Sequence, residues 1–440
     1  MKHFRFSSTL LGIAGLALSI STTPAQTYTL TDLGVLPGMS TSATPKGINN
    51  LAQVAGTSGP MTHALRFTNG TVQDLGTLPG GQISTGWGIN DLGDVVGDSE
   101  YSAAGGAIRH ATLWTDGTTI DLGFLPSSGN YSRGNGINSL GEVVGHSGPS
   151  LDTSNTRAFI WDATNGMRDI GTLGGGWAKA FSINDAGQAT GTSQASLSFH
   201  AFIWDSVNGM RDIGTIAGST STGNFINANG HVAGTSTINN FDNREHAFLY
   251  NGSTMLDLGA IGDNDFLSDR SFAYGINIHD EVVGSTYRPY QGGALYQIAF
   301  VYRDGQMFDL ESLVDTSGAD YRLYTGTGIN DAGQIAVSAI KISTNEIRAV
   351  LLTPNSSSTD TVKIKSAIYT TARKSLAVQA TTSSRTATLS AYITSTDTLI
   401  GPLTKRGSRF SGKFRLPTNP GTITVKSSGG GSATAQVTVR

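Results

Sequence analysis

Residues 157–171 read RAFIWDATNGMRDIG, and residues 200–214 read HAFIWDSVNGMRDIG. The second phrase keeps the apolar positions, the Asn-Gly turn and the Asp-Ile-Gly ending of the first, which is typical of a structural repeat. Weaker copies of the phrase extend from Asp32 to Leu352. One repeated unit therefore sets the architecture of most of the chain.

Seven copies appear when the chain is aligned on the tripeptide Gly-Ile-Asn or its variants, and they lie about 40 to 53 residues apart. They end at Asn49, Asn90, Asn138, Asn184, Asn227, Asn277 and Asn330. In the fourth copy, strand-like segments a to d fall at 178–184, 188–192, 200–204 and 210–214, separated by Asn and Gly residues that suit tight hairpins. This pattern predicts an all-β, seven-bladed β-propeller. The alternative, an open β-solenoid, requires terminal caps that the sequence does not show.

The two ends of the repeat region complement each other. The region begins with a lone strand d at 28–34, whereas the last copy has strands a, b and c but only Thr353-Pro354 where its strand d belongs. We therefore expect the N-terminal strand to complete the last blade and close the ring. Closure of this kind removes the exposed strand edges that promote aggregation.

Four recurring tripeptides connect the chain to a known family. They are Asp121-Leu122-Gly123, Gly136-Ile137-Asn138, Val143-Val144-Gly145 and His246-Ala247-Phe248. Together they resemble the extracellular HAF repeat family of bacterial secreted proteins, over roughly residues 27 to 354. The resemblance implies export and a repeated β architecture, and it brings no shared catalytic activity. The chain departs from the pattern at Arg157 and Arg348 for His, at Ser182 and Phe225 for Gly, and at Glu311 for Gly. A pattern that tolerates such changes behaves as scaffold.

The first 25 residues have the pattern of a secretory signal peptide. Lys2 and Arg5 give a positive start, an apolar stretch covers 10–20, and Thr23-Pro24-Ala25 is a small-residue cleavage site. The apolar stretch is shorter than the roughly 20 residues of a membrane-spanning helix, which argues against a membrane anchor. We expect a secreted protein, extracellular or periplasmic. The chain has no cysteine, so Cys nucleophiles and thiolate metal sites are excluded.

A polar linker at 355–361 separates the predicted propeller, 26–354, from a second domain at 362–440. Alternating apolar stretches with Gly and Pro turns predict a small antiparallel β-sandwich there, similar to the Ig-like modules of exported bacterial proteins. From Asn355 onward there are 12 Lys and Arg and two acids, a net charge of +10, which leaves −13 for the rest of a chain whose total is −3. We expect the basic domain to attract a cell-surface polyanion or the acidic propeller itself; the alternative is a solubilising surface.

Aspartates near the end of strand d and histidines at the start of strand c recur in register. The histidines are His63, His110, His200 and His246. Because they lie in separate blades of the predicted ring, we interpret them as structural partners that bond neighbouring strands, for instance through the Asp, and not as metal ligands. The Asn-x-x-Gly turns lack the alternating acids of calcium loops. We expect no metal and no cofactor.

The binding site is expected on the face with the long connections. The a–b and c–d turns are short, whereas b–c connections such as 98–109 and 285–297 are long and variable, and loops of this kind on a rigid scaffold commonly carry function. Strand a would present cations and aromatic rings at the same opening, which suits a carbohydrate or an anionic oligomer. The candidate residues are Lys46, Trp87, Arg133, Asn135, Lys179, Phe181, Tyr274, Tyr287 and Arg288. The alternative is that the rings only pack between blades.

The main prediction is a secreted, non-enzymatic binding or adhesion protein, a monomer, whose propeller recognises a glycan or a protein partner. The alternative is an extracellular carbohydrate-active enzyme, a polysaccharide lyase or hydrolase, and a third hypothesis is a purely structural extracellular component. Residues that could serve such an enzyme are His146, Arg133, Lys179, Tyr287 and Arg288. The sequence has no Gly-x-Ser-x-Gly elbow, no His-Glu-x-x-His and no phosphate loop. Nucleic-acid binding is disfavoured because the repeat region is acidic.

Overall fold

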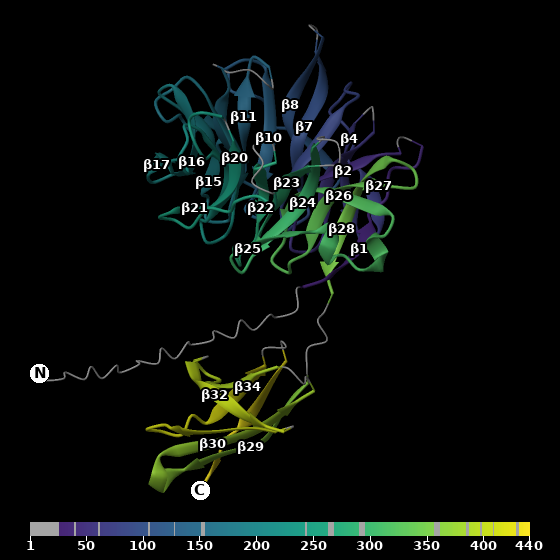
Figure 1. Ribbon diagram of the computed structural model, residues 1–440. Helices are drawn as coiled ribbons and strands as arrows, with labels where there is room; N and C mark the ends of the chain where they lie inside the picture. The colour runs from purple at the N-terminus through teal and green to yellow at the C-terminus, as the bar shows by residue number, and fades with distance from the viewer. Residues whose placement is uncertain are drawn as a thin grey trace, which may run out of the picture. The chain divides into compact units, whose positions relative to one another are not determined.

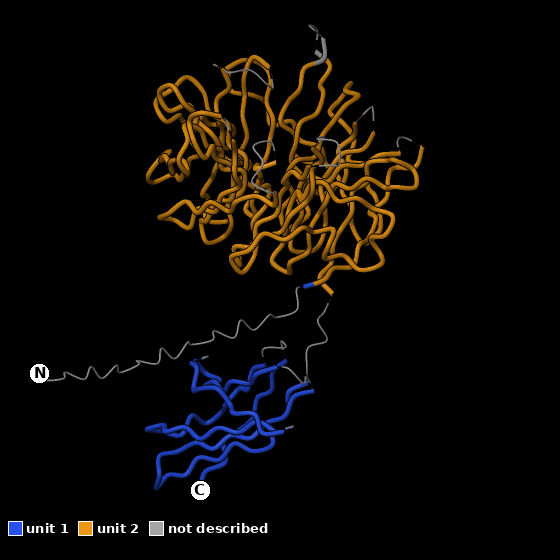
Figure 2. The backbone as a smooth tube through the Cα atoms, viewed as in Figure 1, with its two compact units in different colours: residues 1–26, 356–440 blue, residues 27–355 orange. Residues whose placement is uncertain are grey.

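The computed structural model describes residues 26–440 except 39–40, 60–61, 104–105, 127, 151–154, 243, 263–267, 290–294, 356–360, 384–386, 397, 408 and 428–430. The chain divides into two compact units, one of which is Thr27–Asn355, while the other contains Ser356–Arg440 (Figure 2). The predicted signal peptide, 1–25, and most of the predicted linker, 355–361, lie outside the described residues.

The first unit is a β-propeller of seven blades, each a four-stranded antiparallel sheet (Figure 1). Blade 1 consists of β2 (Ala43–Ile48), β3 (Val54–Ser58), β4 (His63–Thr68) and β5 (Thr71–Asp74). Blade 2 consists of β6 (Ser84–Ile89), β7 (Val95–Ala103), β8 (Gly106–Thr115) and β9 (Thr118–Asp121). Blade 3 consists of β10 (Tyr131–Ile137), β11 (Val143–Gly148), β12 (Arg157–Asp162) and β13 (Gly166–Asp169). Blade 4 consists of β14 (Ala178–Ile183), β15 (Ala189–Ala195), β16 (Ser198–Asp205) and β17 (Gly209–Asp212). Blade 5 consists of β18 (Ser221–Ile226), β19 (Val232–Thr237), β20 (Glu245–Tyr250) and β21 (Met255–Asp257). Blade 6 consists of β22 (Ser271–Ile276), β23 (Val282–Pro289), β24 (Leu295–Arg303) and β25 (Gln306–Asp309). Blade 7 consists of β26 (Tyr321–Ile329), β27 (Ile335–Lys341), β28 (Glu346–Pro354) and β1 (Tyr28–Asp32).

Turn chemistry fixes the blade boundaries. In blade 4, Gly187 in the a–b turn and Gly209 in the c–d turn have φ angles of +73° and +67°. Glycine adopts this left-handed conformation without the strain that a side chain would cause. The strands of this blade coincide with the four predicted segments to within a few residues. The predicted all-β propeller with seven blades is confirmed by the strand pairing.

The first strand lies in the sheet of the last blade. β1 pairs antiparallel with β28, from Tyr28 opposite Pro354 to Asp32 opposite Val350. The Tyr28 and Leu30 side chains are buried in the core of that blade, and the main-chain N–H of Leu30 donates to the Ser317 hydroxyl at the outer edge. Two 3-10 turns, η1 (Glu311–Leu313) and η2 (Thr316–Gly318), lie beside β1, and the N–H of Asp315 between them donates to the Tyr28 carbonyl.

Close approach between strands explains the repeated glycine of strand b. A Cβ atom added at Gly145 would lie 1.9 Å from the Arg133 carbonyl oxygen and 2.8 Å from the ring of Phe159. Phe159 is itself completely buried, as are Phe202, Phe248 and Phe300 at the equivalent positions. The Val-Val-Gly and Ala-Phe elements therefore form the packing between strands and between blades.

Every inner strand carries an irregularity at one fixed position. In each a–b pairing the register shifts immediately before the Gly-Ile-Asn tripeptide or its variant, so one residue of strand a has no partner. The unpaired residues at this position are Lys46, Trp87, Asn135, Phe181, Asn224, Tyr274 and Thr327. Blade 7 has a second unpaired residue, Tyr324. A bulge redirects a side chain locally. Five of the nine candidate binding residues occupy this position.

Two of the predicted long loops are instead strand pairs. Pairing between β7 and β8 continues past Asp98 to Ala103 opposite Gly106, and pairing between β23 and β24 continues past Tyr287 to Pro289 opposite Leu295. The prediction of loops at 98–109 and 285–297 was therefore wrong for most of their length. Continuous ladder hydrogen bonds hold these segments extended, so their side chains sit on rigid ribbons.

The second unit is an eight-stranded β structure. Its strands are β29 (Val362–Thr370), β30 (Ser375–Thr382), β31 (Leu389–Ile393), β32 (Thr398–Arg406), β33 (Arg409–Arg415), β34 (Thr422–Ser427), β35 (Ser432–Gln436) and β36 (Thr438–Val439), with η3 (Thr371–Arg373) between the first two. The strand order is β35-β34-β31-β32-β33-β30-β29-β36. Because β35 and β36 belong to one continuous segment, the sheet nearly closes into a barrel, and the predicted sandwich of Ig-like type stays a prediction. No helix in the described part of the chain is long and apolar enough to cross a membrane.

Candidate functional site

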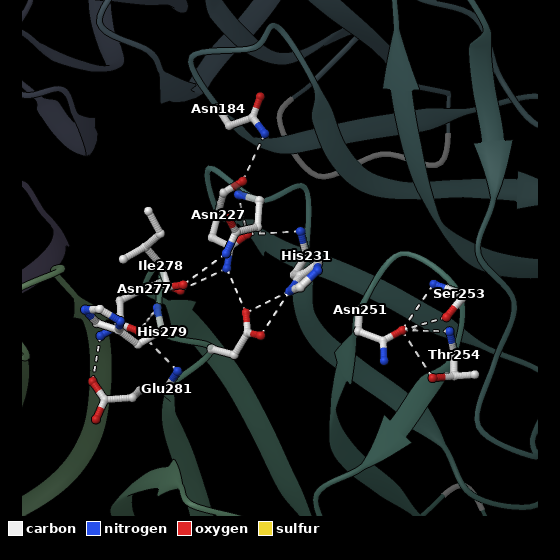
Figure 3. Close-up of polar contacts among 12 residues, drawn as sticks. Asn184, Asn227, His231, Asn251, Ser253, Thr254, Asn277, Ile278, His279 and Glu281 are labelled. Carbon is white, nitrogen blue, oxygen red and sulfur yellow. Dashed lines mark hydrogen bonds and ion pairs between the residues drawn. The ribbon is translucent and has the colours of Figure 1, made fainter. Parts of the chain in front are cut away.

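Seven asparagines, one from each blade, form a closed circle of hydrogen bonds inside the propeller. The side-chain amide of each donates to the main-chain carbonyl of the equivalent asparagine in the next blade, as Figure 3 shows for Asn184, Asn227 and Asn277. The circle runs from Asn49 through Asn90, Asn138, Asn184, Asn227, Asn277 and Asn330 back to Asn49. We call it the asparagine ring. It ties all seven blades together.

The other polar atoms of these asparagines are also satisfied. In blade 4, Asn184 Oδ1 accepts from the N–H groups of Ala186 and Gln188, and its amide also donates to Gln188 Oε1. A cavity of about 180 Å³ inside the propeller is lined by the asparagine ring, its neighbours in sequence, and Trp87 and Phe181. Since the asparagine side chains are already bonded, the polar groups that this cavity offers a ligand are those of the a–b turns, such as Asp91, Asp185 and Asp331.

The recurring histidines bind the recurring aspartates. Nδ1 lies 2.7–3.0 Å from a carboxylate oxygen in the pairs His63–Asp74, His110–Asp121, His200–Asp212 and His246–Asp257. In blade 3, Arg157 takes the place of His and pairs with Asp169 at 2.8 Å. The predicted bond between strands c and d is confirmed. Among the described residues no group of three or more His, Asp or Glu side chains is placed to hold a metal ion.

His246 is held between two carboxylates. Its Nδ1 lies 2.8 Å from Asp257 and its Nε2 lies 3.0 Å from Asp269. Both carboxylates accept, so both ring nitrogens carry protons in this arrangement. Burial by itself lowers the pKa of His246, but the hydrogen bonds and charges of Asp257 and Asp269 outweigh burial and raise it above the ordinary value of 6.5.

The raised pKa predicts a pH-dependent contribution to stability. Protonated His246 stabilises the folded state fully below pH 6.5, the value of the unfolded chain, and this contribution is lost as the pH rises through the higher folded-state pKa. We expect the melting-temperature difference between the wild type and His246→Gln to shrink from pH 6 to pH 9. Asp269→Asn removes one of the two carboxylates that raise the pKa of His246, so in that background the melting-temperature difference should depend less on pH. A constant difference across this range would contradict the assignment.

Three of the candidate residues meet at one point in blades 1 to 3. The Lys46 ammonium lies 4.5 Å from the centre of the Trp87 ring, and the Arg133 guanidinium lies 4.8 Å from it. The residues come from β2, β6 and β10, the inner strands of three successive blades. Cations at this distance are attracted by the ring face of an indole. Trp87 therefore holds two protein cations and is not a free platform for a sugar ring.

A buried carboxylate anchors this group. Asp98 is fully buried and accepts from Trp87 Nε1 at 2.9 Å, from Arg133 Nε at 2.8 Å and from Arg109 Nη1 at 2.7 Å. We refer to Lys46, Trp87, Asp98, Arg109 and Arg133 as the cationic cluster. Asp98 and Arg109 were not among the predicted site residues, since they had been assigned to a loop. The available signal was the Gly105-Gly106 pair between Tyr101 and Ile108, which is typical of a hairpin turn.

The cationic cluster has more positive charge than its carboxylate neutralises. Asp98 pairs with Arg109 and Arg133, and Glu100 lies directly opposite Arg109 in the β7–β8 pair, whereas the Lys46 ammonium contacts the Trp87 ring. Lys46 is half-buried and makes no hydrogen bond or ion pair with any described residue. Burial lowers its pKa, and the nearby Arg133 charge lowers it further. Lys46 therefore lacks an anion.

A second group of ionisable residues lies between blades 5 and 6. The Tyr274 hydroxyl hydrogen-bonds Ser285, and burial raises the pKa of Tyr274. Burial also raises the pKa of the Glu245 carboxyl, against the opposing charge of Arg270. The buried Nε of Arg270 has no hydrogen-bond partner. Tyr287 packs edge-on against Phe272, with ring centres 6.2 Å apart. A carboxyl, a guanidinium and two phenols thus come from neighbouring blades.

The other candidate residues have separate positions. The Asn135 amide donates to the Ala180 carbonyl and contacts His146, which ties blade 3 to blade 4. Arg288 pairs with Asp309 at 2.9 Å. Lys179 is half-buried on β14, and Phe181 lines the central cavity. Of the groups expected for a lyase, Arg133 lies directly opposite His146 in the β10–β11 pair, whereas Tyr287 and Arg288 lie on β23 in blade 6. Arg133 is bound by Asp98 and Arg288 by Asp309.

Comparisons with known proteins give fold-level likeness only. No family model and no curated protein matches the chain. Solved structures that are similar include a gluconolactonase from Xanthomonas campestris (10% identity, 75% of this chain and 91% of that chain, TM-score 0.32). A second is the β-propeller domain of a protease from Pyrococcus furiosus (8% identity, 66% of this chain and 87% of that chain, TM-score 0.36). A third is a putative glucose dehydrogenase from Thermus thermophilus (10% identity, 74% of this chain and 99% of that chain, TM-score 0.29). Likeness at this level says nothing about what this chain binds or catalyses.

Proposed function

We propose that the propeller binds an acidic carbohydrate, whose carboxylate or other anionic group takes the place beside Lys46 and Arg133. The observation that carries the proposal is the unneutralised charge of the cationic cluster. Lys46 has no anionic partner among the described residues, and Arg133 uses only Nε to bind Asp98. Both Nη groups of Arg133 remain as donors for a bidentate contact with a carboxylate.

The surrounding charge makes this cluster distinctive. Residues 27–354 contain 15 Lys and Arg against 30 Asp and Glu, a net charge of −15. A local excess of positive charge within so acidic a ring attracts an anion to one place only if the ligand comes close, because the wider field repels it. We therefore expect a ligand with few charges spread along a mostly neutral chain. An oligosaccharide with occasional acidic sugars fits that description.

The same contacts favour binding over catalysis at this cluster. Arg109 and Arg133 are fixed by a fully buried carboxylate, and that carboxylate has no exposed atom with which to act as a base. General acid–base catalysis needs a titratable group within hydrogen-bond reach of the reacting atom. A rigid pair of cations orients an anion but does not move its protons.

A carbohydrate-active enzyme is the second candidate function, and a different place in the ring favours it. Glu245, with its raised pKa, lies near Arg270 and Tyr274 between blades 5 and 6. A carboxyl that stays protonated closer to neutral pH suits a general acid, and a cation nearby suits an acidic sugar. Release of reducing ends or of unsaturated sugars by the purified protein, lost in Glu245→Gln, would establish this function.

Export and the finer architecture belong to the same proposal. The N-terminal pattern of residues 1–25 and the resemblance to the extracellular HAF repeat family support secretion. The pairing of β1 with β28 supports the role of the N-terminal strand in closing the ring. The second unit, with its eight mostly antiparallel strands, serves in this proposal as an Ig-like module that holds the propeller at a surface.

The proposal is tested by Lys46→Gln. Trigalacturonate serves as the acidic probe and maltotriose as the neutral one, with binding to the full chain measured by calorimetry. Loss of one charge-assisted contact costs about 1.5–3 kcal/mol, so we expect roughly 10- to 100-fold weaker binding of the acidic probe. Quenching of tryptophan fluorescence by the probe should disappear in Trp87→Phe.

Lys341→Gln is the matched control, because Lys341 also lies over an aromatic ring, Tyr321, but in blade 7. It should bind trigalacturonate as the wild type does. Equal affinity of the wild type and Lys46→Gln would contradict the proposed site. Preference for maltotriose over trigalacturonate would contradict the anionic ligand.

A further inference from the structure

One face of the second unit concentrates positive charge along a single strand. On β33, Arg409, Lys413 and Arg415 are exposed, whereas the alternating residues Phe410 and Phe414 turn toward the core. Residues two apart on a strand point to the same side and stand about 7 Å apart. The three cations therefore form a row on the outer side of β33.

Neighbouring elements widen the row. Arg406 on β32 lies directly opposite Arg409 in the antiparallel register, and both are exposed. At the other end of β33, Arg415 lies opposite Ser375, and the Leu416 N–H donates to the carbonyl of Lys374. We call Lys374, Arg406, Arg409, Lys413 and Arg415 the basic strip.

The described part of this unit has no acidic side chain to neutralise the basic strip. Beyond residue 355 the only acids in the sequence are Asp360 and Asp397, and neither is among the described residues. Placing Arg406 directly across from Arg409 is unfavourable for strand pairing by itself, because like charges opposite each other repel. A surface that keeps such a pair without a compensating acid among the described residues is suited to an external polyanion.

We propose that the basic strip is a second binding site, independent of the propeller site, and that its ligand is an acidic polysaccharide lying along β33. The row is straight and solvent-exposed, so it can contact several charges of an extended chain in succession. Attraction between a row of cations and a linear polyanion gains from the release of counterions, which makes the affinity fall steeply with salt.

Other polyanions fit the surface less well. Binding of single-stranded nucleic acid relies on exposed aromatic rings, but in this unit Phe410 is buried, and Lys426 lies 4.7 Å from the centre of the Tyr392 ring. A membrane surface is normally bound with inserted apolar side chains as well as charge. The exposed large apolar residues of the described part of this unit are Leu399 and Val439, both outside β33.

The test is a triple variant of the full chain, Arg409→Gln, Lys413→Gln and Arg415→Gln. Polygalacturonate is the probe, dextran is the neutral comparison, and binding is measured from low to moderate salt. We expect at least a tenfold loss of affinity for polygalacturonate at low salt and a shallower dependence on salt concentration. Lys→Arg and Arg→Lys exchanges at the same positions should restore binding, which separates lost charge from a folding defect.

The matched control removes three charges from the propeller by Arg168→Gln, Arg211→Gln and Lys341→Gln. It should bind polygalacturonate as the wild type does. If the control loses as much affinity as the triple variant, net charge alone explains binding and the site is overturned. Unchanged binding by the triple variant also overturns it.

If single-stranded DNA or anionic vesicles bind more tightly than polygalacturonate through the same three residues, the assignment to a polysaccharide is wrong. All proteins in this comparison also carry Lys46→Gln, so that the propeller site does not contribute and the two sites stay distinguishable.

Discussion

A variant that lacks residues 27–34 is expected to lose the unfolding transition of the propeller or to melt at a much lower temperature. The deletion removes β1, and with it the fourth strand of blade 7. Tyr28 and Leu30 are 1% and 7% exposed, so their loss opens the core of that blade. Truncating buried side chains of this size costs about 2–5 kcal/mol each.

The expected loss approaches the whole stability of a typical domain. Two such side chains and the ladder hydrogen bonds of β1 together come to roughly 5 kcal/mol or more, against a total of about 5–15 kcal/mol. The deletion also exposes the edge of β28, where unpaired main-chain groups invite aggregation. We therefore expect poor recovery of soluble protein as well as a lower melting temperature.

Single substitutions give the matched comparison. Leu30→Ala should lower the free energy of unfolding by about 2–4 kcal/mol, whereas Leu51→Ala, at an a–b turn and 63% exposed, should change it by less than about 0.5 kcal/mol. Chemical denaturation of the two variants measures this difference. A deletion variant with an unaltered melting curve would show that β1 does not hold the ring together.

Replacing Asp98 by Ala is the second substitution with a large expected effect. The carboxylate is fully buried and receives hydrogen bonds from Trp87, Arg109 and Arg133. Its removal leaves two guanidinium groups without their anion. Breaking a buried ion pair in this way costs about 3–5 kcal/mol, and we expect the lower part of that range because both arginines are partly exposed.

Arg168→Gln provides the control for Asp98→Ala, because it breaks a surface ion pair and leaves the turn hydrogen bonds from Thr164 and Asn165 to Asp162 in place. Asp162 also accepts from an arginine, Arg168, but at a surface turn where the Arg168 side chain is 49% exposed. Surface ion pairs contribute roughly 0–1 kcal/mol, so this variant should unfold almost as the wild type does. Equal loss in the two variants, measured by urea denaturation, would contradict the anchoring role of Asp98.

The blades could be predicted because their signals are local. The glycine at 187 and the Asn-Gly pair at 208–209 mark turns that only a few residue types tolerate, and strand lengths follow from the spacing between them. The bond from His63 to Asp74 could also be anticipated, since neighbouring strands bring two recurring positions together. The seven asparagines were aligned in the sequence, but the hydrogen bonds that join them into the asparagine ring were not predicted. Nothing in the sequence of one repeat shows that its asparagine amide reaches the carbonyl of the asparagine in the next blade.

The site could be predicted only in part because it depends on geometry between blades. Lys46, Trp87 and Arg133 were chosen as cations and rings near one opening, and the structure brings these three together. Their meeting depends on the bulge that redirects Lys46 and Trp87, and on Asp98, which lies 35 residues before Arg133. Neither follows from composition or period. The charge that remains unpaired, and not the rings themselves, is what points to an anionic ligand.

The central claim is that the cationic cluster binds an acidic sugar, and one measurement tests it most directly. Trigalacturonate is titrated into two proteins, both with Arg409, Lys413 and Arg415 replaced by Gln so that the basic strip does not contribute, and one of them also with Lys46→Gln. We expect binding to the first and roughly 10- to 100-fold weaker binding to the second. Equal affinity of the two proteins, or no binding by either, would contradict it.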